Sequence, residues 1–119
     1  MITQQFLDCF EASLLKAYNR FLREGAAQIK ADTPEFLKTA NSREDFLQRF
    51  MKTFSEQHSL LIPEIARGGH REPEKILDQI HLRVRNKMAA ADFGKAVPEQ
   101  KAFKKAVLEL KNEIRSAFY

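Results

Sequence analysis

Apolar residues recur along most of this chain at the three- and four-residue spacing of an amphipathic α-helix. Between residues 3 and 24 they lie within about 120° of each other when the helix turns by about 100° per residue. The members of this face are Phe6, Leu7, Phe10, Leu14, Ala17, Tyr18 and Phe21. Gly25 follows the run and is expected to end the helix, because glycine favours the position after the last helical turn.

Capping residues indicate the next two helices. Thr33 followed by Pro34 predicts a short helix to about Thr39, with Thr33 as the N-cap and proline at the first helical position. Ser42 with Asp45 three residues later resembles a capping box and predicts the start of a third helix. The apolar face of that helix consists of Phe46, Leu47, Phe50, Met51 and Phe54.

Prolines and glycines divide the middle of the chain. Proline lacks the amide hydrogen that a helix interior needs, so we expect a kink, or an end and a restart, between Ser55 and Pro63. Gly68 and Gly69 are expected to end that segment. Another helix should start at Pro73 and end before Gly94, with an inward face of Ile76, Leu77, Ile80, Val84 and Met88.

The last predicted helix runs from about Pro98 to Phe118. Its apolar stripe consists of Phe103, Ala106, Val107, Leu110, Ile114 and Phe118. No segment alternates apolar and polar residues with the period of two that a strand requires. We therefore predict an all-α fold, a compact bundle of five or six helices with a phenylalanine-rich core. A length of 119 residues is typical of one domain, so residues 1–119 are expected to form a single helical domain.

The net charge of +4 arises from an excess of basic residues in the second half of the chain. Residues 1–59 contain eight basic and eight acidic side chains, whereas residues 60–119 contain twelve and eight. In the last helix, five cations surround Leu108 on the side away from the apolar stripe: Lys101, Lys104, Lys105, Lys111 and Arg115. An exposed leucine ringed by cations is typical of a contact with an acidic protein partner. A solvated lysine face with one exposed leucine is the alternative interpretation.

Two further basic segments are candidate sites. Arg83, Arg85 and Lys87 would extend the basic surface toward a nucleic-acid backbone. The segment from Met88 to the last helix resembles a helix-turn-helix only in part, because Lys95 and Gln100 would fall at positions that normally pack inward. A candidate anion-binding site precedes the helix that begins at Pro73. It consists of Arg67, Gly68, Gly69, His70 and Arg71. The alternative interpretation is that these residues form only a helix end and a polar connection.

Catalytic motifs are not recognisable in the sequence. The three histidines lack the spacing of a zinc helix, and we expect no metal and no cofactor. The single Cys9 excludes an internal disulfide and is expected to be a buried structural residue. We therefore predict that the protein is not an enzyme, with His70 and His81 as the best candidates for the alternative of dispersed catalytic residues.

The predicted function is protein binding. Small helical proteins of this kind are often bacterial inhibitors of the immunity or antitoxin type, or adaptors, which act by covering a surface of another protein. The alternative is nucleic-acid binding by the basic last third. The longest apolar stretch, residues 60–62, is far too short to cross a membrane. We expect a cytoplasmic protein, and exposed leucines such as Leu15 and Leu108 would also suit a homodimer.

Overall fold

The computed structural model describes residues 1–39, 42–90 and 93–119. In these ranges it contains six α-helices and no β-strand, which confirms the predicted all-α fold. The helices are α1 (Gln4–Gln28), α2 (Thr33–Thr39), α3 (Arg43–Ser55), α4 (His58–Arg67), α5 (Pro73–Ala89) and α6 (Gln100–Ala117).

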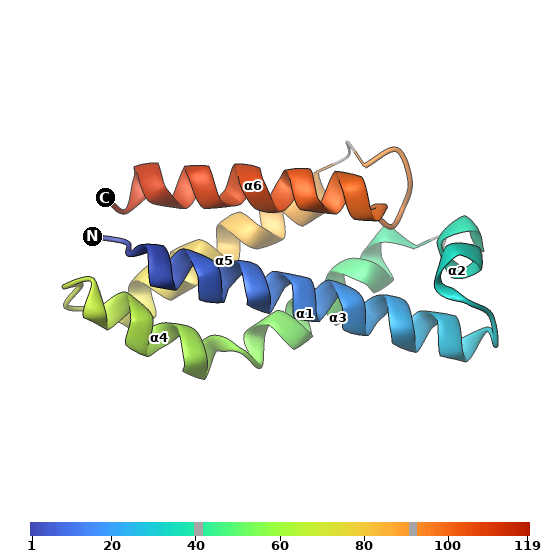
Figure 1. The fold of residues 1–119 in the computed structure, drawn as a ribbon, viewed down its shortest axis with the longest axis horizontal. Coiled ribbons are helices and arrows are strands. Elements are labelled where there is room, and N and C mark those ends of the chain that lie inside the picture. Colours follow the sequence, from blue (N-terminus) through green and yellow to red (C-terminus); the bar gives the residue numbers. More distant parts are fainter. Residues whose placement is uncertain (40–41, 91–92) are drawn as a thin grey trace.

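Helix α1 is the central element of the bundle (Figure 1). It contacts α2, α3, α4 and α6, while α5 packs against α3, α4 and α6. Helices α1 and α6 run in opposite directions, so the two chain ends lie together, and the Ile2 amide donates a hydrogen bond of 3.2 Å to the Phe118 carbonyl. The bundle is elongated, with extents of 46 × 25 × 20 Å.

Aromatic rings fill the core, as the sequence predicted. Nine of the ten phenylalanines are buried, and Phe93 is partly buried against the same cluster. The Tyr18 and Phe103 rings stack with centroids 4.1 Å apart, which joins α1 to α6. The Tyr18 hydroxyl also donates a hydrogen bond of 2.6 Å to the Pro98 carbonyl just before α6. Burial, with a smaller contribution from the charge of Glu99, raises the pKa of Tyr18 to about 12.

The predicted end of α1 at Gly25 is wrong. The helix continues to Gln28, and the left-handed residue is Lys30, with φ of 55°. Gly25 is buried inside the helix because the Phe36 ring of α2 packs directly on its Cα, where a Cβ atom would collide with the ring. Glycine is therefore needed here for close packing of two helices and not for chain reversal.

The helix starts agree with the sequence except at one cap. The Ser42 hydroxyl accepts a hydrogen bond of 3.1 Å from the Asp45 amide, as predicted for α3. In α2, however, the cap is Asp32, whose carboxylate accepts a hydrogen bond of 2.9 Å from the Glu35 amide. Thr33 is already the first helical residue, so the predicted cap was one residue too late. Aspartate and threonine are both good caps, and their order along the chain did not distinguish them.

The chain between Ser55 and Pro63 ends one helix and begins another, as predicted. The break lies at residues 56 and 57, and Pro63 is inside α4. Helix α4 ends at Arg67, and Gly69 after it has a positive φ of 90°. Helix α5 begins at Pro73 as expected.

The connection from α5 to α6 does not support a helix-turn-helix. It spans residues 90–99, of which Ala91 and Asp92 lie outside the described residues, whereas that motif joins its helices by a turn of about three or four residues. Lys95, at a position that the motif would pack inward, is exposed and forms an ion pair of 2.6 Å with Glu99.

Candidate interaction surface on helix α6

Helix α6 separates its apolar and basic side chains by face. Phe103, Val107, Leu110 and Ile114 are buried against the bundle. On the opposite side Leu108 is 58% exposed, and Lys101, Lys104 and Lys105 are exposed around it. We call these four residues the α6 basic face. The helical period places them together because residues three and four apart lie on the same side of a helix.

The three lysines of the α6 basic face are not neutralised. Within residues 1–39, 42–90 and 93–119, none of them forms an ion pair with a carboxylate. Their ammonium groups therefore face solvent, although the Glu109 carboxylate, which pairs with Lys87, lines the same cavity as Lys105.

The other two predicted cations of α6 are engaged with α1. The Lys111 ammonium lies 2.8 Å from the Glu11 carboxylate, and the Lys111 side chain is only 16% exposed. Arg115 donates a hydrogen bond of 3.3 Å to the side-chain oxygen of Gln4. Lys111 is therefore withdrawn from the surface that a partner would meet, whereas Arg115 remains exposed and keeps its charge near the end of α6.

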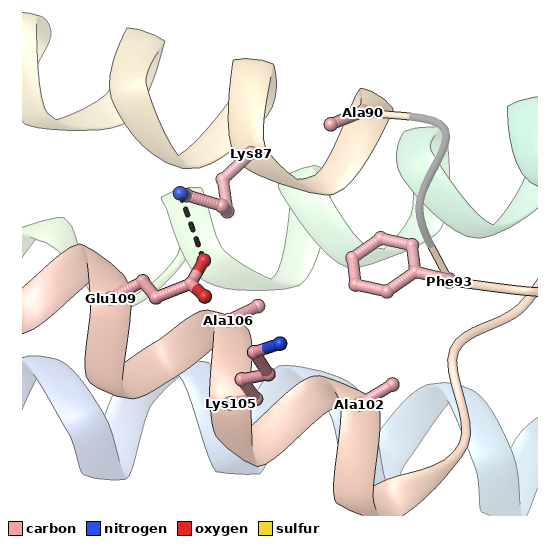
Figure 2. Close-up of a pocket in the computed structure, with 7 residues that line it drawn as sticks. All are labelled: Lys87, Ala90, Phe93, Ala102, Lys105, Ala106 and Glu109. Atoms are coloured by element: carbon pink, nitrogen blue, oxygen red, sulfur yellow. Dashed lines mark hydrogen bonds and ion pairs between the residues drawn. The ribbon is translucent and has the colours of Figure 1, made fainter.

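A small cavity lies beside the α6 basic face, between α6 and the end of α5 (Figure 2). Its volume is about 170 Å³. Its apolar lining consists of the Phe93 ring, Ala90 directly after α5, and Ala102 and Ala106 of α6. Lys105 and the ion-paired Lys87 and Glu109 form its polar edge. The cavity gives the surface a concave, apolar part next to the unpaired Lys105 and the ion pair of Lys87 and Glu109.

Arg83, Arg85 and Lys87 do not form one basic patch. Lys87 bonds to two carboxylates of α6, Glu113 at 2.8 Å and Glu109 at 3.2 Å. The hydrogen bond to Glu113 is the main reason that the Lys87 pKa is raised. The Arg83 guanidinium lies over the Phe118 ring, 5.7 Å from its centroid. Arg85 instead lines a groove between α3 and α5.

The glycine loop after α4 has few free donors for an anion. The Gly68 amide donates to the Ile65 carbonyl at 3.1 Å, and the Gly69 amide donates to the Ala66 carbonyl at 3.0 Å. The Gly68 carbonyl accepts a hydrogen bond of 2.8 Å from the N-terminal nitrogen of Met1. Arg67 pairs with Glu64 at 2.6 Å, while Arg71 and the half-buried His70 follow without joining them in a common site. The alternative interpretation, a helix end with a polar connection, describes this geometry.

Two other sequence predictions are wrong. Cys9 is exposed, because the margin of the α1 apolar face on which it lies is not covered. Leu15 is partly buried against the core, so it is less available for a homodimer than predicted.

One contact between titratable side chains could not be predicted from the sequence. His81 lies beside His58, with 3.3 Å between His81 Nδ1 and His58 Nε2, and not beside His70. The two residues are 23 positions apart in the chain, so no local spacing signals the contact. Burial is the main cause that lowers the pKa of each ring, and the neighbouring His81 lowers that of His58 further.

Comparison with protein-family models, curated protein sequences and solved structures found no match. The function must therefore be argued from the side chains themselves. Among the described residues, no helix has the length and apolar character needed to span a membrane.

Proposed function

We propose that this protein is a small binding module that covers a surface of another protein, as inhibitors of the immunity or antitoxin type and adaptors do. The observation that supports the proposal is Leu108, a 58% exposed leucine flanked on the N-terminal side of α6 by three lysines without carboxylate partners in the described structure. An apolar residue within a polar rim is the usual composition of a protein-binding surface.

The two components of the α6 basic face have different tasks in this proposal. Burial of the exposed part of Leu108 supplies free energy on the order of 1 kcal/mol, because it removes apolar surface from water. The lysines select a partner with an acidic rim and repel basic surfaces. The neighbouring cavity, lined by alanines and the Phe93 ring, suits a small apolar side chain of the partner.

The test is capture of a partner from the native host by four immobilised forms of the protein. These are the wild type, Lys104→Glu, Leu108→Asp and a control, Lys52→Glu, which reverses an exposed lysine of α3. We expect one protein to be captured by the wild type and the control and to be lost in both α6 variants. Its affinity should fall about tenfold for each α6 variant and weaken with salt, because each removes on the order of 1.4 kcal/mol.

The result that contradicts the proposal is equal capture by all four forms. A Leu108→Asp variant that changes only the self-association of the chain, measured by sedimentation, would assign the face to a homodimer instead. Circular dichroism of each variant checks that the helices are intact.

Nucleic-acid binding remains the second candidate because three unpaired lysines lie on two adjacent turns of α6. The engagement of Lys87 with carboxylates and the separate position of Arg85 count against an extended phosphate contact. A gel shift with a short DNA or RNA duplex at about 50 mM salt tests it, since nonspecific binding would be visible at micromolar protein. No shift would remove this candidate.

A further inference from the structure

Helix α4 is held in the bundle by few buried side chains. It has ten residues, of which Leu61 and Ile65 are buried. It begins directly after the break at residues 56 and 57, and it ends at a loop in which Gly69 has a positive φ of 90° (Figure 1). Because both connections are non-helical, α4 can move without unwinding its neighbours. Local opening of a protein starts at elements of this kind, which have few buried contacts.

A polar contact between His58 and His81 joins the start of α4 to α5. The nitrogens that face each other, His58 Nε2 and His81 Nδ1, are 3.3 Å apart, and the two half-buried rings are nearly perpendicular, at 88°. In this hydrogen bond one ring donates an N–H group, and the other accepts it with a nitrogen lone pair. The contact therefore requires that at least one of the two imidazoles is neutral.

The surroundings of both rings disfavour a positive charge. The buried Phe54 ring of α3 packs against them, with its centroid 5.3 Å from that of His58 and 5.9 Å from that of His81. His58 is also the first residue of α4, at the positive end of the helix dipole. The first turn of α4 has no acidic residue, and no side chain caps its amides. A proton on either ring is therefore less favourable in the folded chain than in water.

The charged groups that act on the pair belong to α5. Burial is the main cause that lowers the pKa of each ring, and the neighbouring His81 lowers that of His58 further. Asp78 raises the pKa of both rings in part, while Arg85 lowers that of His81. On the α3 side, Lys52 lines the same groove as Arg85 but does not alter the pKa of either ring. The balance keeps both rings neutral at neutral pH.

We propose that His58 and His81 form an acid-sensitive contact, at which protonation of both rings releases the start of α4 from α5. When both imidazoles are protonated, the two facing nitrogens are both N–H donors with positive charge, so the hydrogen bond is lost and the rings repel each other. Separation of the helices returns the rings to water and uncovers Leu61 and Ile65. The bundle then presents at mildly acidic pH an apolar surface that is closed at neutral pH.

The direction of this response follows from proton binding in the two states. In the open state each ring has its ordinary pKa of 6.5, whereas in the closed state the pKa of each ring is lower. The open state therefore binds more protons, and the closed state loses stability as the pH falls below 6.5. At pH 5.5 each ring favours opening by up to about tenfold, whereas above about pH 7.5 the closed state keeps its full stability.

The test is amide hydrogen exchange of the whole chain at pH 7.5 and pH 5.5, corrected for the intrinsic exchange rates. We expect the opening of α4 to increase at least about threefold at pH 5.5, and that of α6, which contains no histidine, to change by a smaller factor. His58→Gln and His81→Asn each place an amide nitrogen that does not titrate near the facing ring nitrogen. Each should reduce the response of α4, and the double variant should remove it. The control is His70→Asn, which changes a histidine outside the pair and should retain the response.

An NMR titration of the histidine rings tests the wild type without any substitution. We expect His58 and His81 to be protonated in two separate steps below pH 6.5, because a charge on one ring disfavours a charge on the other. The exchange of α4 should accelerate with the second step. Independent titration of both rings near pH 6.5 overturns the proposal, as does equal opening of α4 at the two pH values. The same holds if the response is lost in His70→Asn and kept in the double variant. None of these outcomes depends on whether the α6 basic face binds a protein.

Discussion

At the scale of single residues, Tyr18 connects the core to the start of α6. Its ring is buried against Phe103, and its hydroxyl supplies the hydrogen bond to the Pro98 carbonyl. Pro98 is itself buried, so this carbonyl has little access to water. A buried carbonyl that loses its partner costs more than the bond itself contributes, because desolvation is then uncompensated. One hydroxyl therefore helps to set where the last helix begins.

Tyr18→Phe should lower the free energy of unfolding by about 1–3 kcal/mol at neutral pH, because the Pro98 carbonyl is left without its donor. Chemical denaturation measures the change. The core packing of the ring is retained in this variant, so it isolates the hydroxyl. A stability equal to that of the wild type would contradict the role of this bond.

The same residue predicts a dependence on high pH. The folded protein holds the Tyr18 proton up to a pKa of about 12, whereas the unfolded chain loses it near the ordinary value of 10.0. The stabilisation is therefore complete below pH 10 and is lost as the pH rises toward 12. Lysine ion pairs also weaken in this range, so the difference between wild type and Tyr18→Phe is the quantity to measure. It should shrink between pH 10 and 12.

At the scale of helices, the sequence predicted inward faces well and individual end residues less well. The faces of α1, α3, α5 and α6 follow from periodicity, because each helix buries one continuous stripe. Gly25 was misread because its purpose depends on Phe36, a residue of another helix. Lys111 was predicted to be free because Glu11 is 100 positions away. The pair of His58 and His81 was missed for the same reason.

The contact between α1 and α2 can be tested at Gly25. Gly25→Ala should destabilise the protein by about 1–3 kcal/mol, because the new Cβ collides with the buried Phe36 ring. The same substitution in a Phe36→Ala background should be neutral or stabilising by up to about 1 kcal/mol, since alanine is then simply the better helix former. Thermal or denaturant unfolding of all four proteins gives the comparison. Destabilisation of equal size in both backgrounds would contradict the packing explanation.

At the scale of the whole molecule, the ion pair between Glu11 and Lys111 ties the first helix to the last. Its side chains are 39% and 16% exposed, so the pair is only partly screened by water. Helices α1 and α6 are distant in sequence, and this contact joins two residues that are 100 positions apart in the chain. The same pairing removes one cation from the surface that a partner would meet.

A double-mutant cycle of Glu11→Gln and Lys111→Met measures the contribution of this ion pair to the free energy of unfolding. We expect a coupling free energy of about 0.5–1 kcal/mol, which decreases with added salt. Lys104→Met is the control, because Lys104 has no carboxylate partner in the described structure and should change stability by less than about 0.5 kcal/mol. Zero coupling at low salt would show that the ion pair contributes nothing to the bundle.

The division of the α6 cations into free and engaged groups has a kinetic consequence for the proposed complex. Lys101, Lys104, Lys105 and Arg115 face solvent, but the Debye length is about 8 Å at physiological salt, so their attraction over long distances is weak. Lysine substitutions should therefore change the association rate only moderately, whereas substitution of Leu108 should shorten the lifetime of the complex. The residence time of the partner is then determined by one leucine more than by the charge around it.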